Sequence, residues 1–407
     1  MGNRFRKYVT YSRNIYIVLI SWILLTYISN GVEPYLPNYI TILGGSEADI
    51  GWIYGVVMLI EVPLLLIGGV IGDYVGRRKP IVTLTSTIIL AYLIYYFALN
   101  PICILLGMII QTFTSLYRPS LIALISDSLK PGERGRGIIF IHTLPDLLAI
   151  PAPFIIGYII EYYGGGVEGY KISFVIAVLL ALIAFVFRGL YIEETLKIRH
   201  KEGLFNAVVK SFSLAKLWSI TPAPMKRFII LRVLSHFSFG LYIRYLIRYA
   251  FVNGVTADLW GSIYSVATAS GVFLSIAFMP YVDAIEHRLG LFISFMIRAS
   301  GIFLFLFGGL PGFIVGLPLI FSGRALLIPL LRRYQIDSTP HEIRARVLSI
   351  DLIARNLSMS AGLFLSSLIL IYSGENLFLP IILGGFTTLA TAFAYLVYLP
   401  KLTRIEE

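Results

Sequence analysis

Four acidic side chains lie inside long apolar stretches of this sequence, where a charge is costly. They are Glu33, Glu61, Asp146 and Asp351. Removal from water favours the protonated form of a carboxyl group, so such a residue can exchange a proton near neutral pH. Glu33, Glu61 and Asp146 are therefore candidates for proton coupling, although each could instead have a structural partner. Asp351 lies one helical turn from Arg355, so a structural ion pair is predicted there.

Basic side chains lie in the same stretches and form a larger set: Arg118, Arg232, Arg244, Arg248, Arg298, Arg324, Arg332, Arg333 and Arg355. Arginine binds carboxylate and phosphate groups through two parallel hydrogen bonds, so a cavity lined by these residues favours an anionic solute. The alternative is that some reach lipid headgroups and others neutralise the buried acids. We expect eight residues to line a solute cavity: Asn30, Arg118, His142, Arg232, His236, Arg244, Arg324 and Asn356.

The composition defines the elements that must hold these side chains. Of the 407 residues, 57% are apolar and only 14% charged, with a mean hydropathy of +0.83. A soluble domain needs a larger charged surface, so soluble, disordered and coiled-coil classes are excluded. Continuous apolar runs of about 20 residues span a bilayer as helices, whereas a barrel requires alternation. The sequence predicts an all-α membrane protein with about twelve transmembrane helices, at 15–39, 49–72, 81–99, 102–125, 138–162, 172–191, 228–252, 260–282, 291–307, 312–336, 348–372 and 377–399.

The basic residues outside these runs give the chain an orientation. Lysine and arginine number 33 against 22 acidic residues, and those outside the nine listed above fall on one side of the predicted topology, with Lys171 alone on the other. Arg188, at the end of the sixth run, belongs to this set. Cytoplasmic loops carry such an excess, so we expect a multi-pass protein of the cell membrane with both termini in the cytoplasm. The net charge of +11 then requires no nucleic-acid partner.

The two halves of the sequence match at a constant offset of 210 residues. The matched pairs are Tyr35/Tyr245, Gly51/Gly261, Asp73/Asp283, Arg78/Arg288, Pro119/Pro329 and Asp127/Asp337, among others. Two parallel repeats of six helices are a transporter arrangement, with the solute site at their interface. We predict an N-terminal bundle at 1–190 and a C-terminal bundle at 227–407. The cytoplasmic segment 191–226 between them is either an amphipathic helix on the membrane surface or a plain linker.

A short motif occupies the loop between the second and third runs. Residues 69–79 read Gly-Val-Ile-Gly-Asp-Tyr-Val-Gly-Arg-Arg-Lys, and this resembles the loop 2–3 signature of the major facilitator superfamily. Residues 127–137 resemble the family's loop 4–5 pattern, and 283–288 resemble a second copy that lacks a glycine equivalent to Gly76. The resemblance implies the major facilitator fold. It also implies a cytoplasmic gate formed by Gly69, Asp73, Gly76, Arg77, Arg78, Asp127, Arg134 and Arg136.

The residues of the motif also allow a simpler interpretation. Asp73 can pair with Arg77 or Arg134, or cap a helix, while the basic cluster can serve only to orient the chain. The fifth run faintly resembles the drug–proton antiporter signature G-P-x-x-G-G, but keeps only Pro153 and Gly157. The transport cycle therefore cannot be copied from drug exporters.

The sequence lacks the residue patterns that ATP binding, disulfide formation and zinc binding require. No G-x-x-x-x-G-K-S/T sequence is present, which argues against ATP-driven pumping. The single Cys103 allows no internal disulfide, and five scattered histidines have no zinc spacing. We therefore expect neither enzyme activity, nor a cofactor, nor a bound metal, and we expect a monomer in the lipid bilayer.

These patterns lead to three functional hypotheses. The first is a proton-coupled secondary active transporter that works by alternating access and exports amphipathic compounds. The second is uptake or exchange of an organic anion or a sugar-type metabolite, which the arginines favour. The third, from another class, is a membrane sensor or scaffold that transports nothing. The near-intact loop motif argues against it, because a scaffold has no need of a gate.

Overall fold

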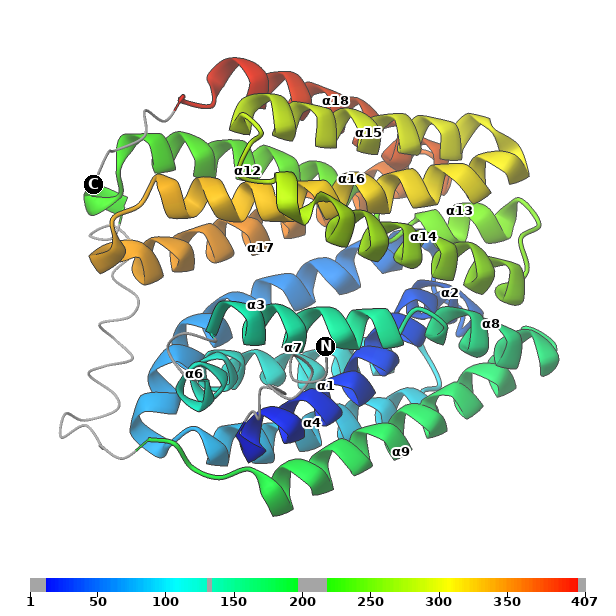
Figure 1. The fold of residues 1–407 in the computed structure, drawn as a ribbon. Coiled ribbons are helices and arrows are strands. Elements are labelled where there is room, and N and C mark those ends of the chain that lie inside the picture. The colour runs from blue at the N-terminus through cyan, green and yellow to red at the C-terminus, as the bar shows by residue number, and fades with distance from the viewer. Residues whose placement is uncertain (1–11, 130–133, 197–217, 402–407) are drawn as a thin grey trace, which may run out of the picture.

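The computed structural model describes residues 12–129, 134–196 and 218–401, and these residues form long helices (Figure 1). Within them, twelve stretches are long and apolar enough to span a membrane. The predicted all-α class and the number of spans are confirmed. The amphipathic pattern predicted for the segment 191–226 falls mostly on 197–217, outside the described residues, so the domain boundaries there remain a prediction.

The six spans of the N-terminal half include several broken helices. Pro34 and Pro37 follow the first long helix and mark its break, because proline removes a backbone donor and clashes with the preceding turn. Ser46 and Asp49 form a capping box that starts the second span. The spans are α1 (Arg13–Gly31) with η1 (Glu33–Tyr35) and α2 (Leu36–Ile42), α3 (Glu47–Val75), α4 (Arg78–Tyr96), α5 (Pro101–Thr112) with η2 (Phe113–Leu116) and α6 (Arg118–Ser128), α7 (Arg134–Leu148) with α8 (Ala152–Tyr162), and α9 (Val167–Tyr191).

The C-terminal half repeats this plan. Its first span is also broken, here by a turn at 243–245 that separates two helices. The spans are α12 (Ala223–Tyr242) with α13 (Leu246–Val252), α14 (Ala257–Phe278) with η4 (Met279–Tyr281), α15 (His287–Phe307), α16 (Gly309–Asp337), α17 (His341–Tyr372) and α18 (Phe378–Tyr398).

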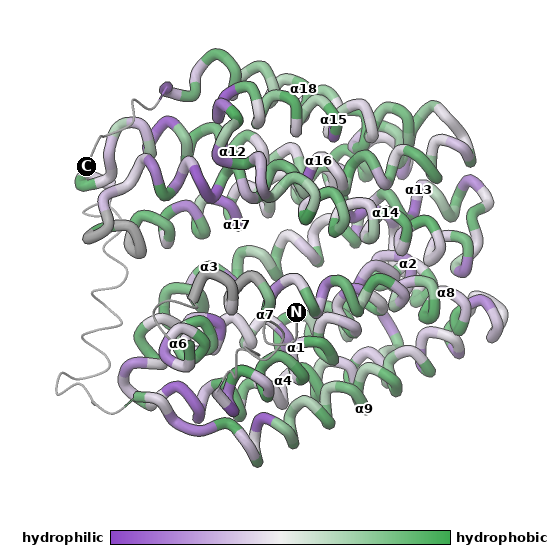
Figure 2. Tube along the Cα trace, viewed as in Figure 1, coloured by the Kyte–Doolittle hydropathy of each residue, from purple (hydrophilic) through white to green (hydrophobic). Residues whose placement is uncertain are grey.

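The helices of the two halves form two groups, one above the other in Figure 1. Alternate turns lie at opposite ends of the helices. We call the left end in Figure 1 the linker face, because the segments 192–196 and 218–222 lie there together with the α3–α4 loop, and the opposite end the distal face. Hydrophilic residues gather at both ends, whereas much of the helix length between them is hydrophobic (Figure 2). This distribution matches a bilayer whose hydrocarbon core lies between the two faces.

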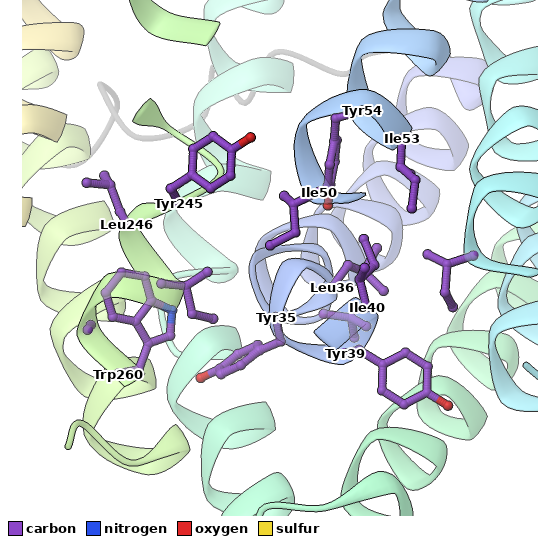
Figure 3. Close-up of a cluster of buried hydrophobic side chains, with 14 of the residues drawn as sticks. Tyr35, Leu36, Tyr39, Ile40, Ile50, Ile53, Tyr54, Tyr245, Leu246 and Trp260 are labelled. Atoms are coloured by element: carbon purple, nitrogen blue, oxygen red, sulfur yellow. The ribbon is translucent and has the colours of Figure 1, made fainter. Parts of the chain in front are cut away.

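The halves meet through two symmetric contacts near the distal face. A Cβ built on Gly51 would lie 2.3 Å from Tyr245 Oη, and one built on Gly261 would lie 2.6 Å from Tyr35 Oη. Both pairs are related by the offset of 210, so each half places a tyrosine against a glycine of the other. Figure 3 shows Tyr35 and Tyr245 in the buried cluster where α3 and α14 approach these side chains. The sequence repeat is therefore also a repeat of contacts.

A buried ion pair stabilises the same region of contact between the halves near the distal face, which we call the seam. Arg248 of α13 donates to Glu47 of α3 at 2.6 Å and also to Asn38 Oδ1. Asn38 and Arg248 occupy equivalent positions in the two repeats, so they meet where the halves are symmetric. The side chains of Arg248 and Glu47 are only 16% and 8% exposed. Low exposure makes the pair costly to break, because either partner alone would leave a buried charge.

In the part of the chain that the structure describes, no comparable contact joins the halves at the linker face. Among the described residues, the hydrogen bonds and ion pairs between the halves lie between the distal face and the contact of Glu61 with Asn356. Glu61 is the middle residue of α3, and Asn356 lies at the middle of α17. The described residues thus close the distal face with polar contacts between the halves and form no such contacts with one another at the linker face.

Candidate functional site

Glu61 is the centre of a polar cluster at mid-depth. Its carboxylate accepts hydrogen bonds from Ser115 Oγ at 2.7 Å, Arg118 Nη1 at 3.2 Å and Asn356 Nδ2 at 3.0 Å. Ser115 and Arg118 belong to the N-terminal half, whereas Asn356 belongs to the C-terminal half. Glu61 is 8% exposed, so its charge depends on these donors. One predicted carboxylate and two predicted cavity residues therefore come together, and they join the two halves.

Glu33 lies nearer the distal face, at the break after α1. Gln111 Nε2 donates to its carboxylate at 2.7 Å, and Tyr95 Oη donates to Gln111 Oε1 at 3.0 Å. Glu33, Arg118 and His142 line a cavity of about 280 Å³ that is bounded by residues of the N-terminal half. The ring of His142 packs edge-on against Trp22, with 4.7 Å between ring centroids. The cavity thus unites residues that are far apart in the sequence.

Two arginines of the C-terminal half face this region from the other side. The Arg244 guanidinium lies 4.1 Å from the ring centroid of Tyr54, and its charge interacts with that of Glu33. Arg324 is exposed although it lies in the middle of α16, and its charge interacts with Asp146 of α7. Because Arg324 is exposed at this depth and its charge interacts with a residue of the N-terminal half, we infer that it lies beside the space between the halves. Both residues remain candidates for solute contact.

Other predicted residues have local partners. Arg232 donates to both carboxylate oxygens of Asp351, at 3.1 and 3.3 Å, and Gln335 donates to the same group. The predicted pairing of Asp351 with Arg355 is therefore wrong, because Arg355 turns to Asn356 Oδ1 instead. The Arg232–Asp351 pair lies within the C-terminal half and holds α12 to α17 there.

Two more predicted cavity residues have no polar partner among the described residues. Nε2 of His236 is buried and has no hydrogen-bond partner there, and the charges around this side chain come from arginines. Asn30 is half-buried in α1 and makes no described hydrogen bond. The structure therefore leaves both side chains free to contact a ligand, but does not join them to the Glu61 cluster.

The loop motif forms a compact ionic cluster at the linker face. Arg77 forms an ion pair with Asp127, and the backbone N–H groups of Arg77 and Arg78 donate to Glu194 at 3.1 and 3.0 Å. Partial burial raises the pKa of Glu194, but hydrogen bonds from four backbone N–H groups outweigh it and bring the pKa below its ordinary value. Gly76 has φ +92°, and a Cβ there would lie 2.6 Å from Glu194 Oε2. A glycine is thus required at position 76 for two reasons. Its backbone has a positive φ, and Glu194 occupies the space that a Cβ would need.

The remaining motif residues face open space. Asp73 is exposed and forms no ion pair with a described residue, and a Cβ on Gly69 would meet nothing within 4 Å. Arg77 pairs with Asp127 rather than with Asp73. The side chains of Arg134 and Arg136 lie outside what the structure describes. Gly69 and Asp73 therefore have no close partner among the described residues, and their role in a gate stays a prediction.

The second copy of the motif keeps the ion pair in altered form. His287 Nε2 lies 3.3 Å from Asp337 Oδ2, and these residues stand at the positions equivalent to Arg77 and Asp127. The pair is ionic only when the histidine is protonated. The copy thus retains the geometry of the first but not its permanent charge.

Sequence reasoning missed three contributors. Glu194 follows α9 directly after Glu193. This acidic pair is the sequence signal that could have identified a partner for the basic loop between α3 and α4. Glu47 lies beside the cap of α3, where a first-turn acid is expected for the helix dipole alone. Arg188, which the sequence places among the orientation signals, is 1% exposed and has hydrogen-bond partners on α1 and α4 that the sequence does not reveal. A charge near a helix end does not reveal which way its side chain runs.

Comparison with known proteins agrees with this arrangement. The sequence profile described as Major Facilitator Superfamily matches residues 17–278. No curated protein sequence matches the chain. The structure is similar to those of a variant of the nucleoside transporter NupG (TM-score 0.77, 14% identity, covering 95% of this chain and 100% of that one) and a variant of the peptide transporter POT with sulfate (TM-score 0.73, 16% identity, 96% and 95%).

A third similar structure is that of the human organic anion transporter MFSD10 (TM-score 0.67, 15% identity, covering 94% of this chain and 99% of that one). At such low identities these likenesses show the fold alone. The family profile covers more than half of the chain, and it includes the motif loop and the whole N-terminal half of the polar cluster. The chain therefore belongs to the Major Facilitator Superfamily and is a membrane transporter, not an enzyme.

Proposed function

We propose that this protein moves an anionic solute across the cell membrane by alternating access and couples this movement to protons. The observation that carries the proposal is the position of Glu61, which bonds to both halves at the middle of α3 and α17. Ionised Glu61 accepts from Arg118 and Asn356 together. Protonation removes one negative charge from this contact, so the free energy that holds the halves together changes with each proton bound.

The linker face is proposed to be cytoplasmic, because the basic loops gather there. The structure then corresponds to the state that is open to the cytoplasm, with the seam of Arg248 and Glu47 closing the outer side. We propose that the protein acts as a monomer, since one chain supplies both halves of the site.

An anionic solute is supported by the balance of partners around the space between the halves. Arg324 is exposed and has no described hydrogen bond, and Nε of Arg244 is buried without one. Glu61, in contrast, already has three donors. Guanidinium donors of Arg324 and Arg244 that have no hydrogen bond to a described residue thus lie beside this space, and a carboxylate or phosphate group complements them.

Export of an amphipathic cation is the second candidate, and Asp146 favours it. Asp146 is exposed within its helix and has no described hydrogen bond, so it offers a free carboxylate to a cationic group. A solute panel that includes matched anions and cations separates the two candidates.

The test is solute flux into proteoliposomes that hold the full chain, with and without a pH gradient. We expect flux of anions that rises with the gradient, and we expect Glu61→Gln to retain exchange of solute while the gradient no longer drives it. Glu33→Gln is the matched control, since Glu33 bonds only within the N-terminal half. Flux that ignores the gradient in the unmodified protein would refute proton coupling. Absence of flux for every compound would favour the sensor.

A further inference from the structure

Arg188 is a buried cation without a described counter-charge. It lies in the last turn of α9 and is 1% exposed. Its Nε donates to Ser21 Oγ at 2.9 Å, and its Nη1 donates to Thr85 Oγ1 at 2.9 Å and to Tyr117 Oη at 3.2 Å. All three acceptors are neutral hydroxyl groups. Among the described residues no carboxylate pairs with this guanidinium.

The direction of the side chain excludes a simple reach to lipid headgroups. Thr85 lies seven residues after the start of α4, or about 10 Å along the helix. Arg188 therefore runs inward, among α1, α4 and α9, rather than outward to the interface. Charges at such depth are usually paired or line a functional cavity. Hydroxyl groups satisfy some donors, and the Tyr117 ring centroid lies 5.4 Å from the guanidinium carbon, but neither supplies a full negative charge.

Arg188 also lines the cavity of about 280 Å³ inside the N-terminal half. Trp22, Leu25 and Leu121 supply apolar walls, and Thr26 adds a hydroxyl group. Nη2 of the guanidinium has no hydrogen bond to a described residue, so one donor group of a buried cation is left unused at a cavity. A dry cavity of about 150 Å³ holds a benzene ring, so this one has room for a ring with a small substituent.

We propose that this cavity binds a small organic carboxylate, with the carboxylate on Arg188 and the apolar body against Leu25 and Leu121. A monoanion fits best, because Arg118 in the same lining is already paired with Glu61, Arg188 alone supplies an unpaired positive charge, and Glu33 repels a second negative charge. The apolar walls favour an organic body over an inorganic ion. The site goes beyond the transport proposed above, because its lining comes from one half and requires no contact between the halves.

The test uses Trp22 as a reporter in the purified full chain. The probe is 4-iodobenzoate, whose heavy atom quenches a nearby indole, and 4-iodobenzamide is the uncharged control. Subtracting the signal of Trp22→Phe isolates the cavity. We expect saturable quenching by the carboxylate alone and at least a tenfold weaker affinity in Arg188→Gln, with Arg188→Lys between the two.

A second variant guards against loss of folding at Arg188. Leu25→Phe narrows the cavity without changing the hydrogen bonds of the guanidinium, and we expect it to lower the affinity for the probe. Leu182→Phe on the exposed side of α9 is the matched control and should leave affinity unchanged.

Three results would each overturn the proposal. They are no saturable quenching in the unmodified protein, equal quenching by the amide, and unchanged affinity in a folded Arg188→Gln variant. A purely structural arginine gives the first result while Arg188→Gln lowers the melting temperature. Because binding is measured without vesicles, failure here leaves the flux proposed above untouched, and loss of flux leaves this binding untouched.

Discussion

Gly76 couples the loop motif to the rest of the N-terminal half at the scale of one residue. Its φ of +92° places the backbone where non-glycine residues are strained. Its missing Cβ leaves room for the Glu194 carboxylate, which accepts from the next two N–H groups. The glycine is therefore needed both for the turn and for the anion that the turn binds.

Gly76→Ala should lower the melting temperature of the purified protein. Gly44→Ala is the matched control, since Gly44 has φ +86° but a Cβ there would meet nothing within 4 Å. The control should lose about 1–2 kcal/mol of unfolding free energy from backbone strain alone. Gly76→Ala should lose more, because φ +92° with ψ 163° is essentially restricted to glycine and because Glu194 is also displaced. Equal losses in the two variants would show that the carboxylate contributes nothing.

Glu194 makes stability depend on pH in a defined direction. Its folded pKa lies below the ordinary value, so its contribution is complete above the unfolded pKa and disappears as pH falls through the folded one. The gap in melting temperature between the unmodified protein and Glu194→Gln should be present at pH 7 and should close in acid. A gap that persists unchanged below pH 4, roughly the ordinary value of a glutamate, would contradict this assignment.

At the scale of elements, helix contacts at the distal seam depend on residues without side chains. A Cβ on Gly51 would lie 2.6 Å from the backbone oxygen of Leu363 as well as against Tyr245, and backbone cannot move aside cheaply. The same α3 helix carries Gly69 near the linker face, where a Cβ meets nothing. The distal end of α3 is thus closely packed, whereas Gly69 near its other end has no neighbour that a Cβ would meet.

Gly51→Ala should shift the protein toward a state that is open at the distal face. The measurement is the reactivity of Ala257→Cys, a buried position on the other side of the seam, in a Cys103→Ser background with a membrane-impermeant maleimide. Gly51→Ala should raise the rate several-fold, and Gly69→Ala should not. If both substitutions act alike, the seam does not control access.

The helices themselves could be predicted, because a long apolar run has few alternatives in a membrane. The breaks at Pro34 and Pro37 follow from local chemistry, and the repeat follows from charged residues that match at one offset. The partners of the site could not be predicted. Arg232 meets Asp351 across 119 positions of sequence, and only the packing of α12 on α17 decides that contact. Arg188 shows the same limit, since its sequence position fits an interfacial residue.

At the scale of the whole molecule, the repeat fixes the framework while the functional residues break the symmetry. The pairs Tyr35/Tyr245 and Gly51/Gly261 make equivalent contacts. Gly271 occupies the position of the second repeat that is equivalent to Glu61, so the carboxylate exists in one half only. A symmetric frame lets the halves rock about one axis, and we propose that the asymmetric site lets that motion respond to a proton and a solute.

The ion pair of Arg248 and Glu47 should set the balance between the two states. Arg248→Met leaves a buried carboxylate unpaired, which costs about 3–5 kcal/mol in the sealed state. We expect the distal face to open, with faster labelling of Ala257→Cys. The double variant Glu47→Gln with Arg248→Gln removes both charges and should restore much of the closure. A double variant as open as the single one would show that the unpaired charge is not the cause.

We propose that one chain alternates between closure at the distal face and closure at the linker face. Two pairs of positions related by the repeat can report it: Ser126 with Ile336 at the linker face, and Tyr162 with Tyr372 at the distal face. Spin-label distances within each pair should be measured in lipid, at high and low pH and with a transported anion. We predict that conditions which shorten the linker-face distance lengthen the distal one. Two distances that change in the same direction, or not at all, would contradict the account.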